Sequence, residues 1–345
     1  MIKGVIFDMD GTIVDSLPYH HEAWRIFFEE NKVDDFYEKL KKYKTTMNSR
    51  RNFIKKSSLI TLGALNYNFS PIIKDINGID ISVITYSFNP GVEDMNVIIQ
   101  NCIDTGSDNI ELMGNHIERS MGMPRSSRSH AEWRANISMK EFKNVKKQFQ
   151  DQGINIFAYK PYCMNPNNKD EEIEYAMKAT KALGAEYVMS ELTSEENTKR
   201  ISHYAEKNNV NVGYHAHLQA SDTAWDFALN DSKNNFINLD IGHYIAAGKK
   251  NTKETLLKFI ENNYARICSL HLKDRQYAKT LNVIATDNQV WGEGDTPITE
   301  VLRLVRDNSY KFTSTIELEY RIPEGSNRVK EVIKCYDYCK QALIS

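Results

Sequence analysis

The sequence predicts an α/β protein whose main part, residues 79–345, is a (β/α)8 TIM barrel. Eight apolar, strand-like runs alternate with amphipathic helical stretches, a pattern typical of βαβ units and a parallel sheet. The 267 residues of this part (345 − 78) are close to the roughly 250 of such a barrel. Ionisable residues end several of the strand-like runs, and a barrel of this type carries its active site at those ends.

The expected strands are short apolar runs separated by helical segments. They are Ile81–Phe88, Asn109–Met113, Ile154–Tyr159, Tyr187–Leu192, Asn211–His217, Phe236–Ile241, Ile267–Leu272 and Phe312–Leu318. Apolar residues at spacings of three and four predict helices such as Met139–Gln152, and Arg328–Leu343 is the last expected helix. An open doubly wound sheet is the alternative, but it would carry a glycine-rich phosphate loop after its first strand, and the sequence after Ile84 is not such a loop.

Composition favours a folded protein that acts on small molecules. The chain is 41% hydrophobic and 26% charged, and its formal net charge is −2. Because no basic field results, we expect no nucleic-acid partner. The cysteines lack the paired spacing of a zinc ribbon or a disulfide framework, so we expect them to pack in the core; they are Cys102, Cys163, Cys268, Cys335 and Cys339.

Residues 1–46 begin with an apolar strand that ends in Asp8 and Asp10, two carboxylates on one side of the strand end. This motif resembles the first motif of the haloacid-dehalogenase-like phosphotransferases, and His20, His21 and Trp24 resemble the β-phosphoglucomutase branch. The resemblance implies that Asp8 is a nucleophile and Asp10 a general acid/base. One strand and one helix cannot form a complete phosphate site, so we expect an incomplete, inactive fragment. A cooperating phosphatase is the alternative.

Residues 47–78 contain Arg50 and Arg51, then Phe53, a lysine pair and the uncharged run from Ser57 to Leu65. This segment resembles a twin-arginine export signal, and its apolar part is too short to be a stable membrane anchor. We expect export to the periplasm if translation starts at Met47, and a cytoplasmic protein otherwise. The upstream 46 residues would then be a fragment of another gene. An ordinary basic helix start is the alternative. No cleavage site is evident near residues 66–70, so the sequence does not predict where the signal would be removed.

Ionisable side chains gather at the ends of the expected barrel strands. In chain order they are Glu111, Glu191, His215, His217, Asp240, His243, His271, Lys273, Glu317 and Glu319. Closure of the barrel brings these strand ends around one opening, and period-two spacing places His215 with His217, and Glu317 with Glu319, on one face. Carboxylates and imidazoles without thiolates suit a divalent metal such as Mn²⁺, Mg²⁺, Co²⁺ or Zn²⁺.

Four segments carry a family resemblance: Leu239–His243, Leu270–Asp274, Trp291–Pro297 and Ile316–Tyr320. They resemble the xylose-isomerase-like barrels of the sugar phosphate isomerase/epimerase group. Ketose 3-epimerases of this group place their first metal-binding Glu on strand 5, where this chain has His215 and His217. Inositol-type dehydratases place it on strand 4. The resemblance therefore implies that the metal ligands are Glu191, Asp240, His271 and Glu317, with Glu319 as the alternative on strand 8.

The expected activity is a metal-dependent isomerisation or epimerisation of a ketose or keto-sugar through an enediolate. The expected base is Glu191, Glu317 or Glu319, with His217 or His243 as its proton-transferring partner and Lys273 orienting substrate oxygens. The residues expected to bind substrate are Glu111, His215, His243, Trp133 and Trp291. The arginine-rich segment Arg119–Arg134 could close over substrate or recognise a phosphate.

Other functions remain open from the sequence. A dehydratase, lyase or hydrolase acting on an inosose or a 3-keto-glycoside could share the same enediolate chemistry. A non-catalytic sugar-binding barrel is a further alternative. A DNA-repair endonuclease would need more metal-binding histidines and a basic groove, and neither is evident. A homodimer is possible. The sequence shows no interface from which the oligomeric state could be predicted.

Overall fold

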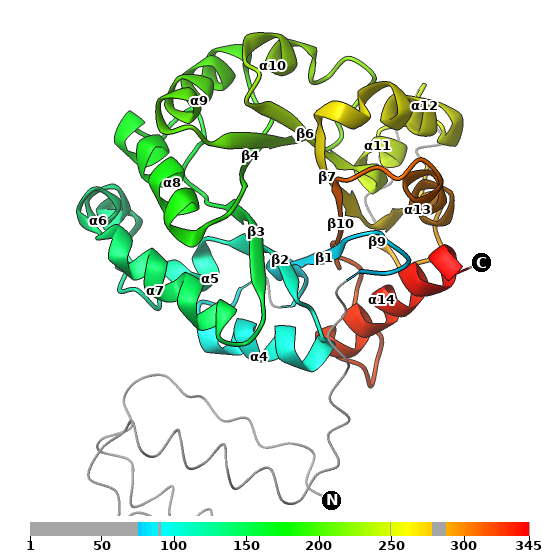
Figure 1. The fold of residues 1–345 in the computed structure, drawn as a ribbon, viewed down its shortest axis with the longest axis horizontal. Coiled ribbons are helices and arrows are strands. Elements are labelled where there is room, and N and C mark those ends of the chain that lie inside the picture. The colour runs from blue at the N-terminus through cyan, green and yellow to red at the C-terminus, as the bar shows by residue number, and fades with distance from the viewer. Residues whose placement is uncertain (1–74, 89–90, 249, 278–287, 345) are drawn as a thin grey trace, which may run out of the picture. The chain divides into compact units, whose positions relative to one another are not determined.

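The computed structural model describes residues 75–88, 91–248, 250–277 and 288–344, which contain a closed barrel of eight parallel strands (Figure 1). The strands close in the order β1-β10-β7-β6-β5-β4-β3-β2, which confirms the predicted fold class. They are β1 (Ile81–Ile84), β2 (Asn109–Met113), β3 (Asn155–Lys160), β4 (Tyr187–Glu191), β5 (Asn211–His215), β6 (Asn235–Asp240), β7 (Ile267–Leu272) and β10 (Thr313–Ile316). The segments that resemble a dehalogenase motif and an export signal lie outside the described residues, and they remain predictions.

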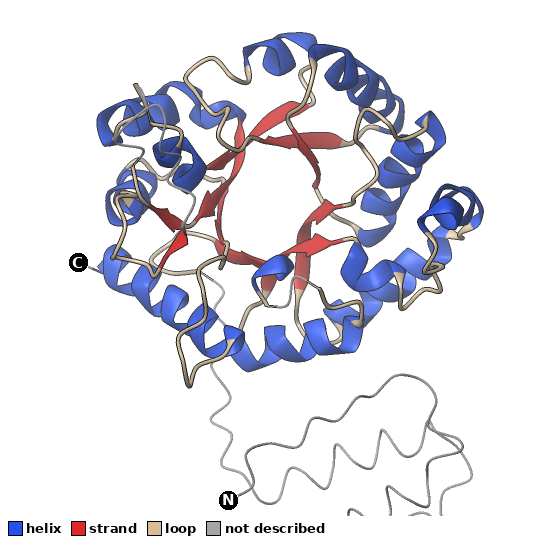
Figure 2. Cartoon of the chain, turned by 180° about the vertical axis from the view of Figure 1, so that it is seen from behind, coloured by secondary structure: helices blue, strands red, loops and turns tan. Residues whose placement is uncertain are grey.

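Helices surround the barrel on its outside (Figure 2). The principal ones are α4 (Met95–Thr105), α7 (Met139–Gln150), α8 (Asp170–Leu183), α9 (Glu195–Asn208), α10 (Asp226–Asp231), α12 (Lys253–Asn263), α13 (Ile298–Asp307) and α14 (Arg328–Ile344). The connections add α5 (Asn115–Glu118), α6 (His130–Asn136), α11 (Ile241–Ala246) and the antiparallel pair β8 (Asp274–Arg275) and β9 (Asn288–Gln289). Short 3₁₀ turns are η2 (Thr85–Ser87), η3 (Ser127–Ser129) and η4 (Tyr264–Arg266).

Strands β1, β5 and β10 end two or more residues earlier than the sequence predicts. β1 stops at Ile84 because η2 follows at once, and Thr85 Oγ1 there accepts a hydrogen bond from the backbone N–H of Met113 at 3.0 Å. β5 stops at His215 because the chain then turns, with Ala220 N donating to His217 O at 3.0 Å. His217 therefore lies beyond the strand face on which it was predicted, yet its ring centroid is 4.7 Å from that of His215, so the two histidines are neighbours.

The barrel interior is closely filled below the polar strand ends. An added Cβ on Gly213 of β5 would lie 2.4 Å from Met189 Sδ and 2.8 Å from Cys268 Sγ, so only glycine fits there. A second apolar layer lies between the sheet and the helices, where Phe142, Val145 and Phe149 of α7 are buried. All five cysteines are buried and free, as expected for packing residues.

Asp80 connects several strands by hydrogen bonds at the end of the barrel opposite the ionisable cluster. Its carboxylate accepts hydrogen bonds from Asn109 Nδ2 at 2.9 and 3.1 Å and from Thr313 Oγ1 at 2.7 Å. Asn155 Nδ2 in turn donates to Asn109 Oδ1 at 2.9 Å. This network connects the starts of β1, β2, β3 and β10, and it leaves the opposite ends of the strands available for a site.

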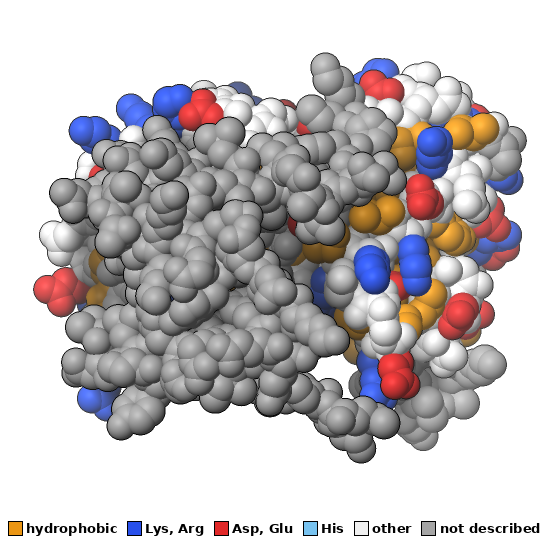
Figure 3. Space-filling view, turned by 90° about the horizontal axis from the view of Figure 1, so that it is seen from below, with side chains coloured by type: hydrophobic (Ala, Val, Ile, Leu, Met, Phe, Trp, Pro, Cys, Tyr) orange, Lys and Arg blue, Asp and Glu red, His pale blue; other side chains and the backbone are white. Residues whose placement is uncertain are grey.

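No one type of charge dominates the described part of the face shown in Figure 3. Basic, acidic and apolar side chains are interspersed there. Across the described residues, none of the helices combines the length and apolar character that crossing a membrane requires.

Candidate active site

His271 is the centre of a fully buried chain of ionisable groups at the strand ends. Its Nε2 lies 2.9 Å from Glu111 Oε2 on β2, and its Nδ1 lies 2.8 Å from Glu317 Oε2, just after β10. Burial alone would lower the pKa of His271, but the two carboxylates outweigh burial and raise it to about 10. The structure therefore brings three of the predicted residues into direct contact.

Lys273, two residues beyond His271, binds three carboxylates at once. Its Nζ lies 3.0 Å from Asp240 Oδ2, 2.9 Å from Glu317 Oε2 and 2.6 Å from Glu319 Oε2. Burial would lower the pKa of Lys273, yet these carboxylates raise it, so the ammonium form is stable. Lys273 and His271 likewise hold the pKa of Glu317 well below its usual range against the effect of burial.

The two carboxylate oxygens of Asp240 have different roles, one as a helix cap and the other as part of the site. Oδ1 accepts a hydrogen bond from His243 N at 2.7 Å and thereby caps α11. Oδ2 is buried, accepts no hydrogen bond with regular geometry, and faces Lys273 and the Nε2 atoms of His243 and His215 at 3.8 and 4.0 Å. Burial raises the pKa of Asp240. A buried carboxylate oxygen that faces an ammonium and two imidazoles, without a regular hydrogen bond, is suited to a cation.

Gly242 allows α11 to lie directly against the end of β7. An added Cβ there would lie 2.4 Å from Lys273 Cγ and 2.8 Å from Lys273 O. The first turn of α11 and Lys273 are therefore fixed together, and a larger residue at this position would displace the lysine from its carboxylates.

Two histidines beside Asp240 have their ring nitrogens fixed by neighbours. His215 Nδ1 lies 3.0 Å from Asn238 Oδ1, and His243 Nδ1 lies 2.8 Å from an Nη of Arg275. Burial, reinforced by nearby positive groups, lowers the pKa of both imidazoles. Both are therefore neutral at physiological pH.

Glu191 and His217 lie at the rim of the opening. Glu191 Oε1 is 3.0 Å from Lys160 Nζ, and its Oε2 is 3.5 Å from His217 Nδ1. The side chain of Glu191 is 32% exposed and that of His217 is 52% exposed, so this pair faces solvent. The carboxylates of Glu191, Glu111 and Glu317 raise the pKa of Lys160, although burial opposes them.

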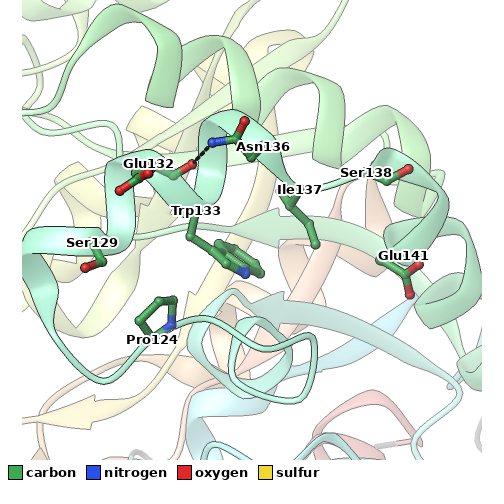
Figure 4. Close-up of a pocket in the computed structure, with 8 residues that line it drawn as sticks. All are labelled: Pro124, Ser129, Glu132, Trp133, Asn136, Ile137, Ser138 and Glu141. Atoms are coloured by element: carbon green, nitrogen blue, oxygen red, sulfur yellow. Dashed lines mark hydrogen bonds between the residues drawn. The ribbon is translucent and has the colours of Figure 1, made fainter.

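Neither predicted tryptophan joins the strand-end cluster. Trp133 lies on α6, which Figures 1 and 2 place at the outer edge of the ring of helices, and its ring packs edge-on against Tyr175 at 6.3 Å. It lines an open groove of about 610 Å³ together with Pro124 and Ile137 (Figure 4). Trp291 is buried against Tyr338 of α14, at 5.7 Å between ring centroids. We therefore do not assign substrate stacking to either ring.

The arginine-rich segment is likewise tied to the fold. Arg134 is buried and forms ion pairs with Glu172 at 2.8 Å and with Glu118 at 3.4 Å. Arg119 pairs with Glu93 at 3.1 Å. These two arginines stabilise helix packing, which leaves Arg125 and Arg128 as the exposed members of the segment.

Several site residues were not predicted from the sequence. Lys160 ends β3 just as Glu191 ends β4, so its position in the strand was an available signal. Asn238 lies two residues before Asp240 on the same strand, and period two places both on one face. Tyr86 lies in η2, just beyond the end of β1, and no signal in the sequence pointed to it; burial and then the charges of Glu319 and Glu317 raise its pKa.

The side chains fit a divalent metal. Ligand atoms of His215, Asp240 and His271 lie within 4.8 Å of one another, and Glu317 lies 2.8 Å from His271. Atoms that bind one ion at about 2.0–2.2 Å are themselves about 3–4 Å apart. Asp240 Oδ2, which lacks a regular hydrogen bond, is one of them. Glu191 is in neither of the two candidate ligand groups among the described residues.

Comparison with known proteins identifies the type of barrel. The IolI protein with a bound zinc atom is 15% identical, with 77% of this chain and 100% of that chain covered and a TM-score of 0.57. A sugar phosphate isomerase/epimerase from Parabacteroides distasonis is also 15% identical, with 77% and 96% covered and a TM-score of 0.52. The probable 3-DHS dehydratase AsbF from Bacillus anthracis is 16% identical, with 75% and 99% covered and a TM-score of 0.52. At these identities the likeness shows the fold alone.

No curated protein matches the chain. Residues 100–339, well over half of the sequence, match the family described as xylose isomerase-like TIM barrel. The chain therefore belongs to the xylose isomerase-like TIM barrel family.

Proposed function

We propose that this chain is a divalent-metal-dependent isomerase or epimerase that acts on a ketose or keto-sugar through an enediolate. One observation carries the proposal: Asp240, His271 and Glu317 converge from the adjacent strands β6, β7 and β10 on one buried point beside Lys273. Those three residues would hold the ion. A bound divalent ion supplies a Lewis acid that polarises a carbonyl and stabilises developing negative charge.

Two carboxylates, Glu191 and Glu319, would move a carbon-bound proton on opposite faces of a substrate in this proposal. Glu191 ends β4 and Glu319 follows β10, and these strands are four steps apart in either direction around the eight-stranded barrel. One carboxylate removes the proton next to the carbonyl and the other returns a proton from the far side. Such transfer inverts the configuration at that carbon.

Lys273 and His243 supply the remaining polar groups. The buried ammonium of Lys273 offsets negative charge on the enediolate oxygen. Arg275 has only donors, so His243 Nδ1 accepts from it and the neutral ring carries its proton on Nε2, which lies 3.8 Å from Asp240 Oδ2 and 3.5 Å from Lys273 Nζ. In the proposed mechanism this N–H donates to a substrate oxygen.

That N–H also favours a second candidate, a lyase or hydrolase of keto-sugars. After the same proton abstraction, the Nε2–H of His243 could protonate a departing hydroxyl or glycosidic oxygen. An inosose or a 3-keto-glycoside would be the substrate, and the leaving group would distinguish a dehydratase from a glycoside-cleaving enzyme.

Solvent deuterium incorporation tests the proposal. The metal-loaded protein would be incubated in D₂O with ketoses, inososes and 3-keto-glycosides, and NMR would detect deuterium at the carbon next to the carbonyl. We expect exchange in the wild type and none in Asp240→Asn. Asp151→Asn is the matched control, because Asp151 is exposed at the end of α7, near the opposite end of the barrel.

The products decide between the candidates. An inverted sugar supports an epimerase, whereas loss of water or of a glycosyl group supports the second candidate. A loaded protein that binds sugars but exchanges no deuterium with any of them would be a non-catalytic binding barrel, and the proposal would then fail.

A further inference from the structure

We propose that His215, through Nε2, is the fourth ligand of this ion, which would be held by two imidazoles and two carboxylates and would be Zn²⁺ or Co²⁺ in preference to Mg²⁺. The inference rests on the metal site of the proposed function. It replaces Glu191, the ligand expected from the sequence, and it specifies the kind of ion.

The positions of the two side chains favour His215 over Glu191 as the ligand. His215 is buried, with 1% of its surface exposed, and Asp240 Oδ2 lies 4.0 Å from its Nε2. Glu191 is instead bound to Lys160 and His217 at the rim. A ligand role for Glu191 would break its ion pair with Lys160 and leave a buried ammonium without its nearest carboxylate.

Hydrogen bonding fixes which nitrogen of His215 is available. Asn238 Nδ2 lies 3.0 Å from Ser269 Oγ, 3.1 Å from His271 Nε2 and 3.5 Å from Glu111 Oε2, and the carboxylate of Glu111 only accepts hydrogen bonds. The amide oxygen of Asn238 therefore faces His215, whose Nδ1 carries the proton and donates to it. Nε2 keeps its lone pair and lies on the side of Asp240.

His271 also has one nitrogen held by a carboxylate. Glu111 Oε2 accepts the Nε2–H of His271 at 2.9 Å, and Nδ1 faces Glu317 Oε2 at 2.8 Å, so an ion bound between His271 and Glu317 would take the place of the proton on Nδ1. A ligand histidine whose other nitrogen donates to a carboxylate or carbonyl-type oxygen is the usual arrangement at protein metal sites. Both His215 and His271 have it.

A competing group of three histidines, His215, His217 and His243, lacks this arrangement. Their ligand atoms also lie within 4.8 Å of one another. The Arg275 guanidinium occupies Nδ1 of His243, however, and the proton of the neutral ring is then on Nε2. Neither nitrogen of His243 has a lone pair left for a metal, so Asp240 is the better third partner.

The ligand set determines the preferred ion. An imidazole in place of a carboxylate removes one negative charge and supplies a nitrogen donor. Mg²⁺ prefers oxygen ligands, whereas imidazole suits Zn²⁺ and Co²⁺. The site should therefore discriminate against Mg²⁺ more strongly than a site with three carboxylates and one histidine.

Metal binding to the full chain tests this without measuring turnover. Chelator-stripped protein would be titrated with Zn²⁺, Co²⁺ or Mg²⁺ alone, and pulsed EPR of the Cu²⁺-loaded protein would count coordinated imidazoles. We expect two imidazoles in the wild type and one in His215→Ala, with Zn²⁺ binding weakened by at least about 100-fold. His215→Glu should lower the Zn²⁺/Mg²⁺ affinity ratio by about 10-fold or more.

Two controls share the chemistry but not the proposed role. Glu191→Gln and His217→Gln should leave the affinity for Zn²⁺ within about 3-fold of wild type. Loss of the ion in Glu191→Gln with retention in His215→Ala overturns the assignment, and loss in His217→Gln points to the three-histidine group instead. If His215→Ala does not fold, His215→Gln keeps a polar side chain of similar length and should show the same loss.

The failure of this inference is distinguishable from that of the proposed function. Two imidazoles on the ion with no deuterium exchange would sustain the ligand assignment and reject the activity. Deuterium exchange by a protein whose ion has only one imidazole would sustain the activity and reject the ligand assignment. Absence of any tightly bound divalent ion would reject both.

Discussion

Lys273 Nζ lies 3.0 Å from Asp240 Oδ2, so a buried ammonium contacts a carboxylate oxygen that we also propose as a metal ligand. Glu317 Oε2 is shared in the same way, at 2.9 Å. Buried carboxylates without a partner are costly, and Lys273 offsets their repulsion in the metal-free protein. An ion and Lys273 would therefore compete for the same oxygens.

Lys273→Met should consequently bind Zn²⁺ more tightly, by about 10-fold, because it removes the competing cation. The metal-free variant should be less stable than wild type by about 3–5 kcal/mol, since buried carboxylates lose their partner. Chelator competition would measure the affinity, and thermal unfolding with and without Zn²⁺ should give a larger shift than in wild type.

The exposed Lys140→Met is the matched control and should change neither quantity. Weaker Zn²⁺ binding in Lys273→Met would contradict the competition between Lys273 and the ion. It would mean that Lys273 instead holds the carboxylate ligands in position.

Glu111→Gln should weaken Zn²⁺ binding by about 10- to 100-fold with little change in secondary structure. Glu111 is fully buried and accepts the Nε2–H of His271, so its negative charge makes the other nitrogen of that ring a stronger donor. Titration of stripped protein checks this, with the exposed Glu171→Gln as control. An unchanged affinity would show that Glu111 does not act through His271.

Much of this architecture was accessible from the sequence because the barrel pattern fixes which ends of the strands meet. Once eight βα units are recognised, Glu111, Asp240, His271 and Glu317 must surround one opening, although they are up to 206 positions apart (317 − 111). Their contacts in the structure follow from that topology. Periodicity also predicted α7 and α14, whose ends differ from expectation by no more than two residues.

Local geometry could not be obtained in the same way. His217 does lie beside His215, with 4.7 Å between the ring centroids, but not through strand alternation, because the chain leaves β5 at His215. Trp133 was expected at the opening, but α6 carries it to the outer edge. Spacing alone also could not show that Asn238 and Arg275 set the proton positions of two histidines, because that depends on contacts across strands.

Asp80→Asn should destabilise the barrel by about 1–3 kcal/mol without changing Zn²⁺ affinity. The carboxylate of Asp80 accepts from Asn109 Nδ2 and Thr313 Oγ1, and an amide would turn one donor toward another. Urea denaturation would measure the loss, and zinc titration would show that the site at the other end is intact. A stability equal to wild type would mean that water replaces these bonds without cost.

Glu172→Gln should reduce stability at neutral pH, and the difference from wild type should shrink in acid. Glu172 pairs with Arg134 at 2.8 Å, and its Oε2 accepts from Lys169 N at 3.1 Å. Burial alone would raise its pKa, but these hydrogen bonds and Arg134 hold the pKa below its usual range.

The direction of the pH effect follows from proton binding. An unfolded chain protonates a glutamate near pH 4.3, whereas the folded protein does so only at lower pH. The stabilisation by Glu172 is therefore complete above about pH 5 and declines as the pH falls through the folded pKa. Gln cannot titrate, so the wild type minus Glu172→Gln difference in unfolding free energy isolates this group from other acids. Urea unfolding between about pH 3 and 7 measures it, and a difference that stays constant or grows in acid would show that the Arg134 contact does not depend on the charge of Glu172.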